Sequence, residues 1–134
     1  MNPVPPSPLA GQQQDSPPRV FILLSSYNGA VYLHEQLQSL TAQSHPYWTL
    51  YWRDDGSSDA TVDILYDFAA SIGSDRCVRV PDPTSRIGPT ASFITILRAA
   101  VPAMQEGDYV AFADQDDVWL PDKLARGLAA LTIR

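Results

Sequence analysis

The chain has 134 residues, which suits a single domain, and 45% of them are hydrophobic, which is enough to form a core. Its formal net charge is -6 at pH 7, so nonspecific binding to nucleic acid or to an anionic membrane surface is disfavoured. The single cysteine, Cys77, excludes an intramolecular disulfide and a cysteine-only zinc site.

Residues 1–18 differ in composition from the rest, being rich in proline and glutamine. Proline at this density builds neither a helix nor a sheet ladder, so we expect a disordered leader, with a polyproline ligand for a partner as the alternative. The segment lacks the basic-then-apolar layout of a signal peptide, and no apolar run approaches the roughly 20 residues of a membrane span. We therefore expect a cytoplasmic protein with no transmembrane segment.

From residue 19 to residue 134, short apolar runs alternate with amphipathic segments. The runs at 20–24, 49–52, 77–80 and 109–113 are rich in β-branched and aromatic residues and are predicted strands, with Cys77 as a core residue of the third. Apolar residues recur at helical spacing between and after them, which predicts helices near 30–40, 62–69, 93–100 and 124–131. This alternation indicates an α/β fold, a Rossmann-like parallel sheet with helices on both faces.

The predicted helix starts carry recognisable residues. Ser58 or Asp59 can accept a hydrogen bond from a free backbone N–H of the helix that follows. Pro89 and Pro121 suit a first helical turn, where no backbone donor is needed. Trp119 is interpreted as core or lid packing.

Polar clusters follow three of the predicted strands, at 25–28, at 54–55 and at 114–116. In open parallel sheets the ligand binds outside the carboxyl ends of the strands, where the strand order reverses. We expect the strand order 3-2-1-4, which makes these three strands neighbours and brings the clusters together. The order 2-1-3-4 is the alternative, and it would separate the fourth strand from the first.

Asp114, Asp116 and Asp117 directly follow the last apolar run. Neighbouring carboxylates repel one another and lose hydration when they are half-buried, so an Asp-x-Asp at a strand end is best explained by a hard divalent cation that takes oxygen ligands. Mg²⁺ or Mn²⁺ held here could neutralise a departing diphosphate. The alternatives are a solvated loop before a helix and a phosphatase of the haloacid dehalogenase type, whose Asp-x-Asp normally follows the first strand.

Taken together, the segments 25–29, 37–43, 53–59 and 114–123 resemble glycosyltransferase family 2, in the nucleotide-sugar-binding N-terminal half of a rhamnosyltransferase-like GT-A fold. The resemblance runs from about Arg19 to Leu131. It implies an enzyme that transfers a sugar from a metal-bound nucleoside diphosphate sugar to a saccharide acceptor in surface polysaccharide synthesis.

The resemblance also implies roles for individual residues after the first two strands. Ser25 and Tyr27 would contact the base and ribose of the nucleotide. Asp55, with Asp54 beside it, would contact the base.

After the later strands, Asp114 would bind ribose and metal, and Asp116 would be the direct metal ligand. The family often has Asn-x-Gly after its third strand, whereas this chain has Arg86-Ile87-Gly88. Arg86 could reach a phosphate.

Members of the family carry the acceptor site and a carboxylate general base in further strands and helices. Because the sequence ends at Arg134, we expect a truncated GT-A fold that is inactive alone, and we nominate no general base. Asp122 lies too close to the metal motif for that role. The alternative from another class is a non-catalytic fragment or interaction subunit, because a sheet ending at its fourth strand should expose an edge and an apolar surface that favour association.

Overall fold

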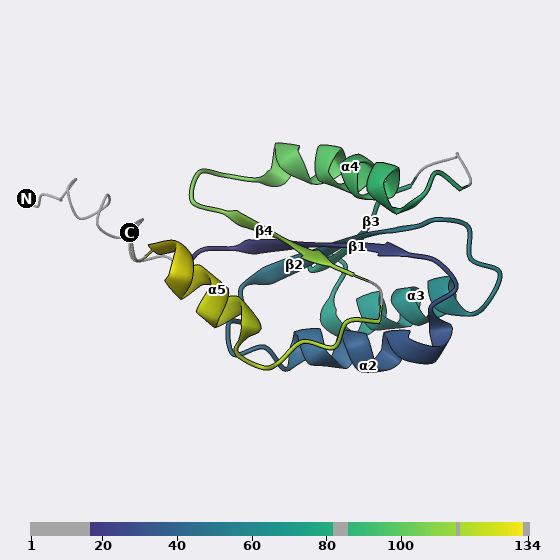
Figure 1. Cartoon of the computed structure of the whole chain (residues 1–134), viewed down its shortest axis with the longest axis horizontal. Helices are drawn as coiled ribbons and strands as arrows, with labels where there is room; N and C mark the ends of the chain where they lie inside the picture. The colour runs from purple at the N-terminus through teal and green to yellow at the C-terminus, as the bar shows by residue number, and fades with distance from the viewer. Residues whose placement is uncertain (1–16, 82–85, 115, 133–134) are drawn as a thin grey trace, which may run out of the picture.

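The computed structural model describes residues 17–81, 86–114 and 116–132 (Figure 1). Nearly all of the leader predicted at 1–18 lies outside these residues. The described elements, in chain order, are β1 (Val20–Ser26), α2 (Ala30–Thr41), β2 (Trp48–Asp54), α3 (Thr61–Ile72), β3 (Cys77–Arg79), α4 (Pro89–Ala100), the 3₁₀ turn η1 (Val101–Ala103), β4 (Tyr109–Ala113) and α5 (Lys123–Thr132).

Within the described residues, the strands form one four-stranded sheet in the order β3-β2-β1-β4. All three pairings are parallel, with Val20 opposite both Trp48 and Tyr109 in the register of β1. The expected order 3-2-1-4 is confirmed, and the alternative 2-1-3-4 is excluded. β1, β2 and β4 therefore end at the same edge of the sheet (Figure 1).

Helices cover both faces of the sheet, as the apolar strands predicted: α2, α3 and α5 lie on one face and α4 on the other (Figure 1). Alternate residues of β1 point to opposite faces because a strand has a period of two. Val20, Ile22 and Leu24 join the larger core cluster with α2, whereas Phe21 and Leu23 pack with Ile96 and Ala100 of α4. Burial on both faces explains why β1 reads as a continuous apolar run.

The local signals at the helix starts are largely confirmed. The Asp59 carboxylate accepts hydrogen bonds from the backbone N–H of Thr61 at 3.0 Å and of Ala30 at 3.1 Å, so one side chain serves the first residues of both α3 and α2. Pro89 occupies the first turn of α4, as predicted. The prediction for Pro121 is wrong, because α5 begins at Lys123, two residues after it.

Cys77 is buried in the sheet, as predicted. Burial raises the pKa of its thiol to about 11, which leaves the sulfur protonated and unreactive at neutral pH. Among the described helices, none has the length and apolar character needed to cross a membrane.

Candidate functional site

The loops that follow β1 and β2 are joined by hydrogen bonds. The Asn28 backbone N–H donates to Ser57 Oγ at 2.7 Å, and the Ser58 N–H donates to Asn28 Oδ1 at 2.8 Å. Asn28 has φ 47°, in the left-handed region that Asn tolerates better than most residues. The two loops therefore form one unit at the carboxyl edge of the sheet.

Asp54, at the end of β2, organises the turn that follows it. Its Oδ1 accepts from Ser26 Oγ at 2.9 Å and from Ser57 Oγ at 2.6 Å. Its Oδ2 accepts from the backbone N–H groups of Gly56 at 3.1 Å and Ser57 at 2.7 Å. In this structure, the half-buried Asp54 shapes the loop.

Asp55 lies inside the protein, with only 3% of its surface exposed. Its Oδ1 is 2.8 Å from Arg53 Nη1 and accepts from the Ile87 N–H at 2.9 Å, and its Oδ2 accepts from the Gly88 N–H at 3.0 Å. Burial on its own would raise the pKa of Asp55, but the hydrogen bonds from Arg53, Ile87 and Gly88 outweigh it and hold the pKa below its usual value. Asp55 is ionised and internally paired.

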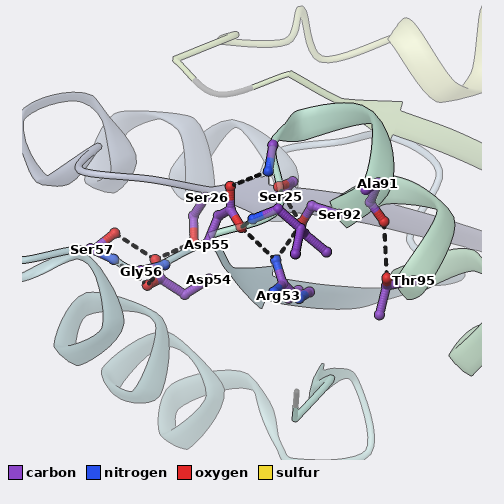
Figure 2. A network of polar contacts seen from close by, with 12 residues as sticks. Ser25, Ser26, Arg53, Asp54, Asp55, Gly56, Ser57, Ala91, Ser92 and Thr95 are labelled. Carbon is purple, nitrogen blue, oxygen red and sulfur yellow. Dashed lines mark hydrogen bonds and ion pairs between the residues drawn. The ribbon is translucent and has the colours of Figure 1, made fainter. Parts of the chain in front are cut away.

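Arg53 and Ser92 extend this contact into a network that links three elements (Figure 2). Arg53 Nη1 donates to Ser92 Oγ at 3.0 Å, and Ser25 Oγ donates to the same oxygen at 2.7 Å. Neither Arg53 nor Ser92 was assigned a role from the sequence. An Arg directly after the apolar run of β2 was a usable signal, since a buried guanidinium needs a carboxylate partner.

Tyr27 and Arg86 meet although 59 positions separate them in the numbering. Arg86 Cζ lies 3.7 Å from the centroid of the Tyr27 ring, within the range of a cation–π contact. Tyr27 is half-buried and Arg86 is exposed. The structure thus brings together two of the residues that the sequence analysis singled out.

Asp114 and Asp116 follow β4, and both are exposed. The Asp114 carbonyl accepts from Gln36 Nε2 of α2 at 2.6 Å and from the Asp117 N–H at 3.1 Å. Asp116 has φ 65°, a conformation that non-glycine residues seldom adopt. Helix α2 therefore fixes the start of the acidic loop.

Ser39 of α2 and Gln43, two residues after the helix ends, hold the rest of that loop. Ser39 Oγ accepts from the Trp119 N–H at 3.1 Å. Gln43 Nε2 donates to the Leu120 carbonyl at 2.7 Å, and its Oε1 accepts from the Leu124 N–H at 3.1 Å. Trp119 is buried in the larger core cluster, which confirms the packing interpretation of this residue.

Gln36, Ser39 and Gln43 were not predicted from the sequence as contributors to the site. Gln36 and Ser39 are buried in α2 together with Leu37 and Leu40, and Gln43 is buried two residues after the helix ends. Polar residues at core-facing positions need hydrogen-bond partners, so their spacing was a usable signal.

Asp114 and Asp116 supply the hard oxygen atoms that Mg²⁺ and Mn²⁺ prefer. Within residues 17–81, 86–114 and 116–132, no group of three His, Cys, Asp or Glu side chains is arranged to hold a metal ion. Asp122 is exposed and forms an ion pair with Arg126 at 3.7 Å.

A parallel α/β sheet of this order, with polar loops at the carboxyl edge, defines a Rossmann-like domain of the kind that binds nucleotides. The chain belongs to glycosyltransferase family 2, because the model of that family, described as "Glycosyl transferase family 2", matches residues 21–132. This membership disfavours the phosphatase alternative.

Two proteins with similar sequences support the assignment to glycosyltransferase family 2. Protein CgeD of Bacillus subtilis (strain 168) is 30% identical over 112 residues, which cover 81% of this chain and 25% of that protein. The dTDP-rhamnosyl transferase RfbG of Shigella flexneri is 29% identical over 108 residues, covering 81% of this chain and 36% of RfbG. The chain thus spans well under half of either relative.

Among solved structures, the mannosyltransferase PcManGT from Pyrobaculum calidifontis, in complex with GDP-Man and Mn²⁺, superimposes with a TM-score of 0.71 at 23% identity. The match covers 92% of this chain and 38% of that one. It confirms the GT-A type of fold for the described sheet.

Proposed function

We propose that the carboxyl edge of the sheet binds the nucleoside diphosphate sugar used in a glycosyl transfer reaction, and that the acceptor is a saccharide of a surface polysaccharide. One observation carries the proposal: in a member of glycosyltransferase family 2, Tyr27, Arg86, Asp114 and Asp116 follow strands that end at this one edge. The relatives named above include a dTDP-rhamnosyl transferase and a structure with GDP-Man, which supports a nucleotide-sugar donor.

The first proposed contacts come from the ends of β1 and β2 and from the segment before α4. Ser25 and Tyr27 contact the base and ribose, with the Tyr27 ring as an apolar surface. Arg86 offers a planar guanidinium that can form two parallel hydrogen bonds to a phosphate. Asp54 contributes by holding the loop after β2 in shape.

Asp114 and Asp116 are proposed to hold Mg²⁺ or Mn²⁺. Mg²⁺ is usually bound by one or two protein carboxylates together with substrate phosphates, and two exposed acids on a loop anchored by Gln36 meet that requirement. When bound, the metal supplies positive charge to the departing diphosphate. Without a cation, a protein of net charge -6 would repel the anionic donor.

The test is calorimetric titration with UDP, dTDP and GDP, with and without Mn²⁺, on the wild type and on Asp116→Ala. We expect Mn²⁺-dependent binding of at least one nucleotide, weakened about tenfold or more in Asp116→Ala because a metal ligand is lost. Asp67→Ala is the matched control, since it removes the same charge from an exposed position of α3 and should bind as the wild type does. A wild type that binds none of the nucleotides would refute the proposal.

A second candidate, an interaction subunit, is favoured by one observation on β4. Val110 and Phe112 are 37% and 54% exposed on an edge strand that, in the described part of the chain, pairs with β1 alone. Exposed apolar side chains beside an unpaired strand edge favour association.

A further inference from the structure

A single buried guanidinium links the loop after β2 to α4 (Figure 2). Arg53 Nη1 donates to Asp55 Oδ1 at 2.8 Å and to Ser92 Oγ at 3.0 Å. We propose that Arg53 and Ser92 are positioning residues: they orient Asp55 so that its Oδ2 accepts a hydrogen bond from a ring N–H of the nucleobase. The inference rests on the proposed function, because it concerns the same nucleotide.

The two oxygens of the Asp55 carboxylate differ in the donors that they already have. Oδ1 accepts from Arg53 and from the Ile87 N–H at 2.9 Å. In the part of the chain that the structure describes, Oδ2 accepts from the Gly88 N–H alone, at 3.0 Å. Each oxygen of an ionised carboxylate can accept about two hydrogen bonds. Oδ2 therefore keeps one acceptor position, and Asp55 can use it while Oδ1 stays on Arg53.

The ion pair with Arg53 decides which oxygen is left over. The backbone of Asp55 is fixed against β1, because its N–H donates to the Ser26 carbonyl at 2.8 Å. Arg53 is 1% exposed, and a buried guanidinium that lost its counter-charge would be strongly unfavourable. The pair therefore holds Oδ1 toward the interior, which leaves Oδ2 for a ligand.

Ser92 fixes the guanidinium in turn. Nη1 carries two N–H bonds, one for Asp55 and one for Ser92, so its donors are matched to these two oxygens. Ser92 is fully buried in α4, and its backbone N–H donates to the Gly88 carbonyl at 2.9 Å. Its Oγ also accepts from Ser25 Oγ at 2.7 Å. The network thus joins Asp55 to Ser25, a residue that we propose to contact the base and ribose.

An ionised carboxylate selects among bases by the atom that the base presents. Asp55 is ionised at neutral pH, so both of its oxygens accept hydrogen bonds and neither donates. Uracil, thymine and guanine have a ring N–H, whereas neutral cytosine and adenine have a ring nitrogen lone pair in the equivalent position. An oriented Oδ2 therefore favours nucleoside diphosphates of the first three bases.

The experiment measures this contact by calorimetry with Mn²⁺. The ligands are whichever of UDP, dTDP and GDP bind, each paired with its analogue methylated on the ring N–H. The discrimination factor is the dissociation constant of the methylated analogue divided by that of its parent. In the wild type it should be about tenfold or more, because the methyl group removes a hydrogen bond to a charged acceptor. Pyrophosphate with Mn²⁺ is the probe that has no base.

Three variants test the positioning residues. Ser92→Ala leaves the ion pair in place and should reduce the discrimination factor about threefold. Arg53→Met should remove most of it, because a buried carboxylate without its counter-charge takes up a proton and becomes a weaker acceptor. Arg53→Lys should restore a large part of what Arg53→Met loses, because an ammonium group can donate to both oxygens. Pyrophosphate binding should be the same in all three as in the wild type.

Arg98→Met is the control of equal charge change, since Arg98 is exposed in the last turn of α4. It should leave the discrimination factor and pyrophosphate binding unchanged. If Arg53→Met does not fold, Ser92→Ala decides, because its ion pair is intact.

The inference is overturned if Ser92→Ala and Arg53→Met discriminate as strongly as the wild type does. It is also overturned if they weaken pyrophosphate and nucleotide by the same factor, because the network would then act on the fold alone. A wild type that binds nucleotide without discriminating refutes the inference and leaves the proposed function standing. A wild type that binds no nucleotide refutes the proposed function, and the inference with it.

Discussion

Asp116 combines a chemically useful side chain with an unfavourable backbone conformation. Its φ of 65° lies in the left-handed region, which costs an ordinary L-residue roughly 1–2 kcal/mol and an Asp somewhat less. Its carboxylate is exposed, and in the described part of the chain it forms no hydrogen bond or ion pair. Strain at a residue with no structural partner is consistent with a role in ligand binding.

Replacing Asp116 with glycine should therefore separate stability from metal binding. We expect Asp116→Gly to be as stable as the wild type or more stable by up to about 1 kcal/mol, because glycine adopts this φ without strain. Urea denaturation measures the stability, and calorimetry with Mn²⁺ and a nucleoside diphosphate measures the binding, which should be lost. Asp116→Ala should be slightly less stable than Asp116→Gly. A clear destabilisation by Asp116→Gly would mean that the carboxylate has a structural partner.

The ionised Asp55 makes the stability of the protein depend on pH. Its pKa in the folded state lies below the ordinary value of 3.8, because its hydrogen bonds with Arg53, Ile87 and Gly88 outweigh the effect of burial. The unfolded state therefore binds the proton more tightly, so the contribution of Asp55 to stability is complete above the unfolded pKa and declines as pH falls through the folded one.

This dependence can be measured as the difference in unfolding free energy between the wild type and Asp55→Asn. At pH 7 the wild type should be more stable by about 3 kcal/mol, since the variant leaves Arg53 without a counter-charge in the interior. The difference should persist down to about pH 5 and shrink below pH 3.8, where Asp55 takes up a proton. A difference that stays constant down to pH 2.5 would show that the charge of Asp55 is not what stabilises the fold.

At the scale of elements, α2 acts as the support of the acidic loop. Gln36, Ser39 and Gln43 bind the backbone at Asp114, Trp119 and Leu120. Gln36 and Ser39 of the helix and Gln43 just after it thus form a polar stripe among apolar contacts. Their side-chain hydrogen bonds hold the loop in place, since residues 116–122 belong to no helix or strand.

Removing one member of the stripe tests this role. Gln43→Ala leaves the Leu120 carbonyl and the Leu124 N–H without their side-chain partner, which should cost about 1–3 kcal/mol. The Leu124 amide should also exchange faster in this variant. Gln38→Ala is the control, because Gln38 is an exposed residue of α2 close to Gln43 in the sequence and its loss should change stability by less than about 0.5 kcal/mol. Equal effects of the two substitutions would contradict the supporting role of Gln43.

The helices and strands could be predicted from the sequence because each depends mainly on residues close together in the chain. The run 20–24 is apolar at every position because β1 is buried on both faces, and Pro89 marks the start of α4. The strand ends were less accurate, since β2 extends to Asp54, beyond the apolar run at 49–52. Arg53 and Asp54 are polar, and their place in the strand depends on partners elsewhere in the chain.

The candidate site was only partly predictable for the same reason. Asp54 and Asp55 are adjacent in the sequence, yet one carboxylate shapes a turn and the other binds amides more than 30 residues away. That difference is set by where α4 begins relative to β2, which is a tertiary property. The pairing of Tyr27 with Arg86 likewise arises from the strand order.

For the molecule as a whole, the two edges of the sheet differ in exposed apolar surface. β3 is short, with Cys77 buried and Arg79 exposed, whereas β4 exposes Val110 and Phe112. These two β4 residues share a face because a strand has a period of two, and Phe112 meets Phe93 of α4 edge-on at 5.4 Å between ring centroids. The β4 edge therefore exposes more apolar surface than the β3 edge.

The exposed apolar residues of the β4 edge should drive association that depends on protein concentration. We expect sedimentation velocity to show a rising average mass for the wild type as concentration increases, and a smaller rise for the variant with Val110→Lys and Phe112→Lys, because lysine blocks edge-to-edge pairing. Loss of the contact between Phe112 and Phe93 should cost about 1 kcal/mol, so the variant should remain folded.

Val31→Lys separates this edge effect from general surface polarity. Val31 is 86% exposed on α2, away from β4, so the substitution adds a charge and removes an exposed apolar residue without touching the strand edge. It should leave the association unchanged. If Val31→Lys reduces the average mass as much as the β4 variant does, association is nonspecific, and the β4 edge loses its support as an interaction surface.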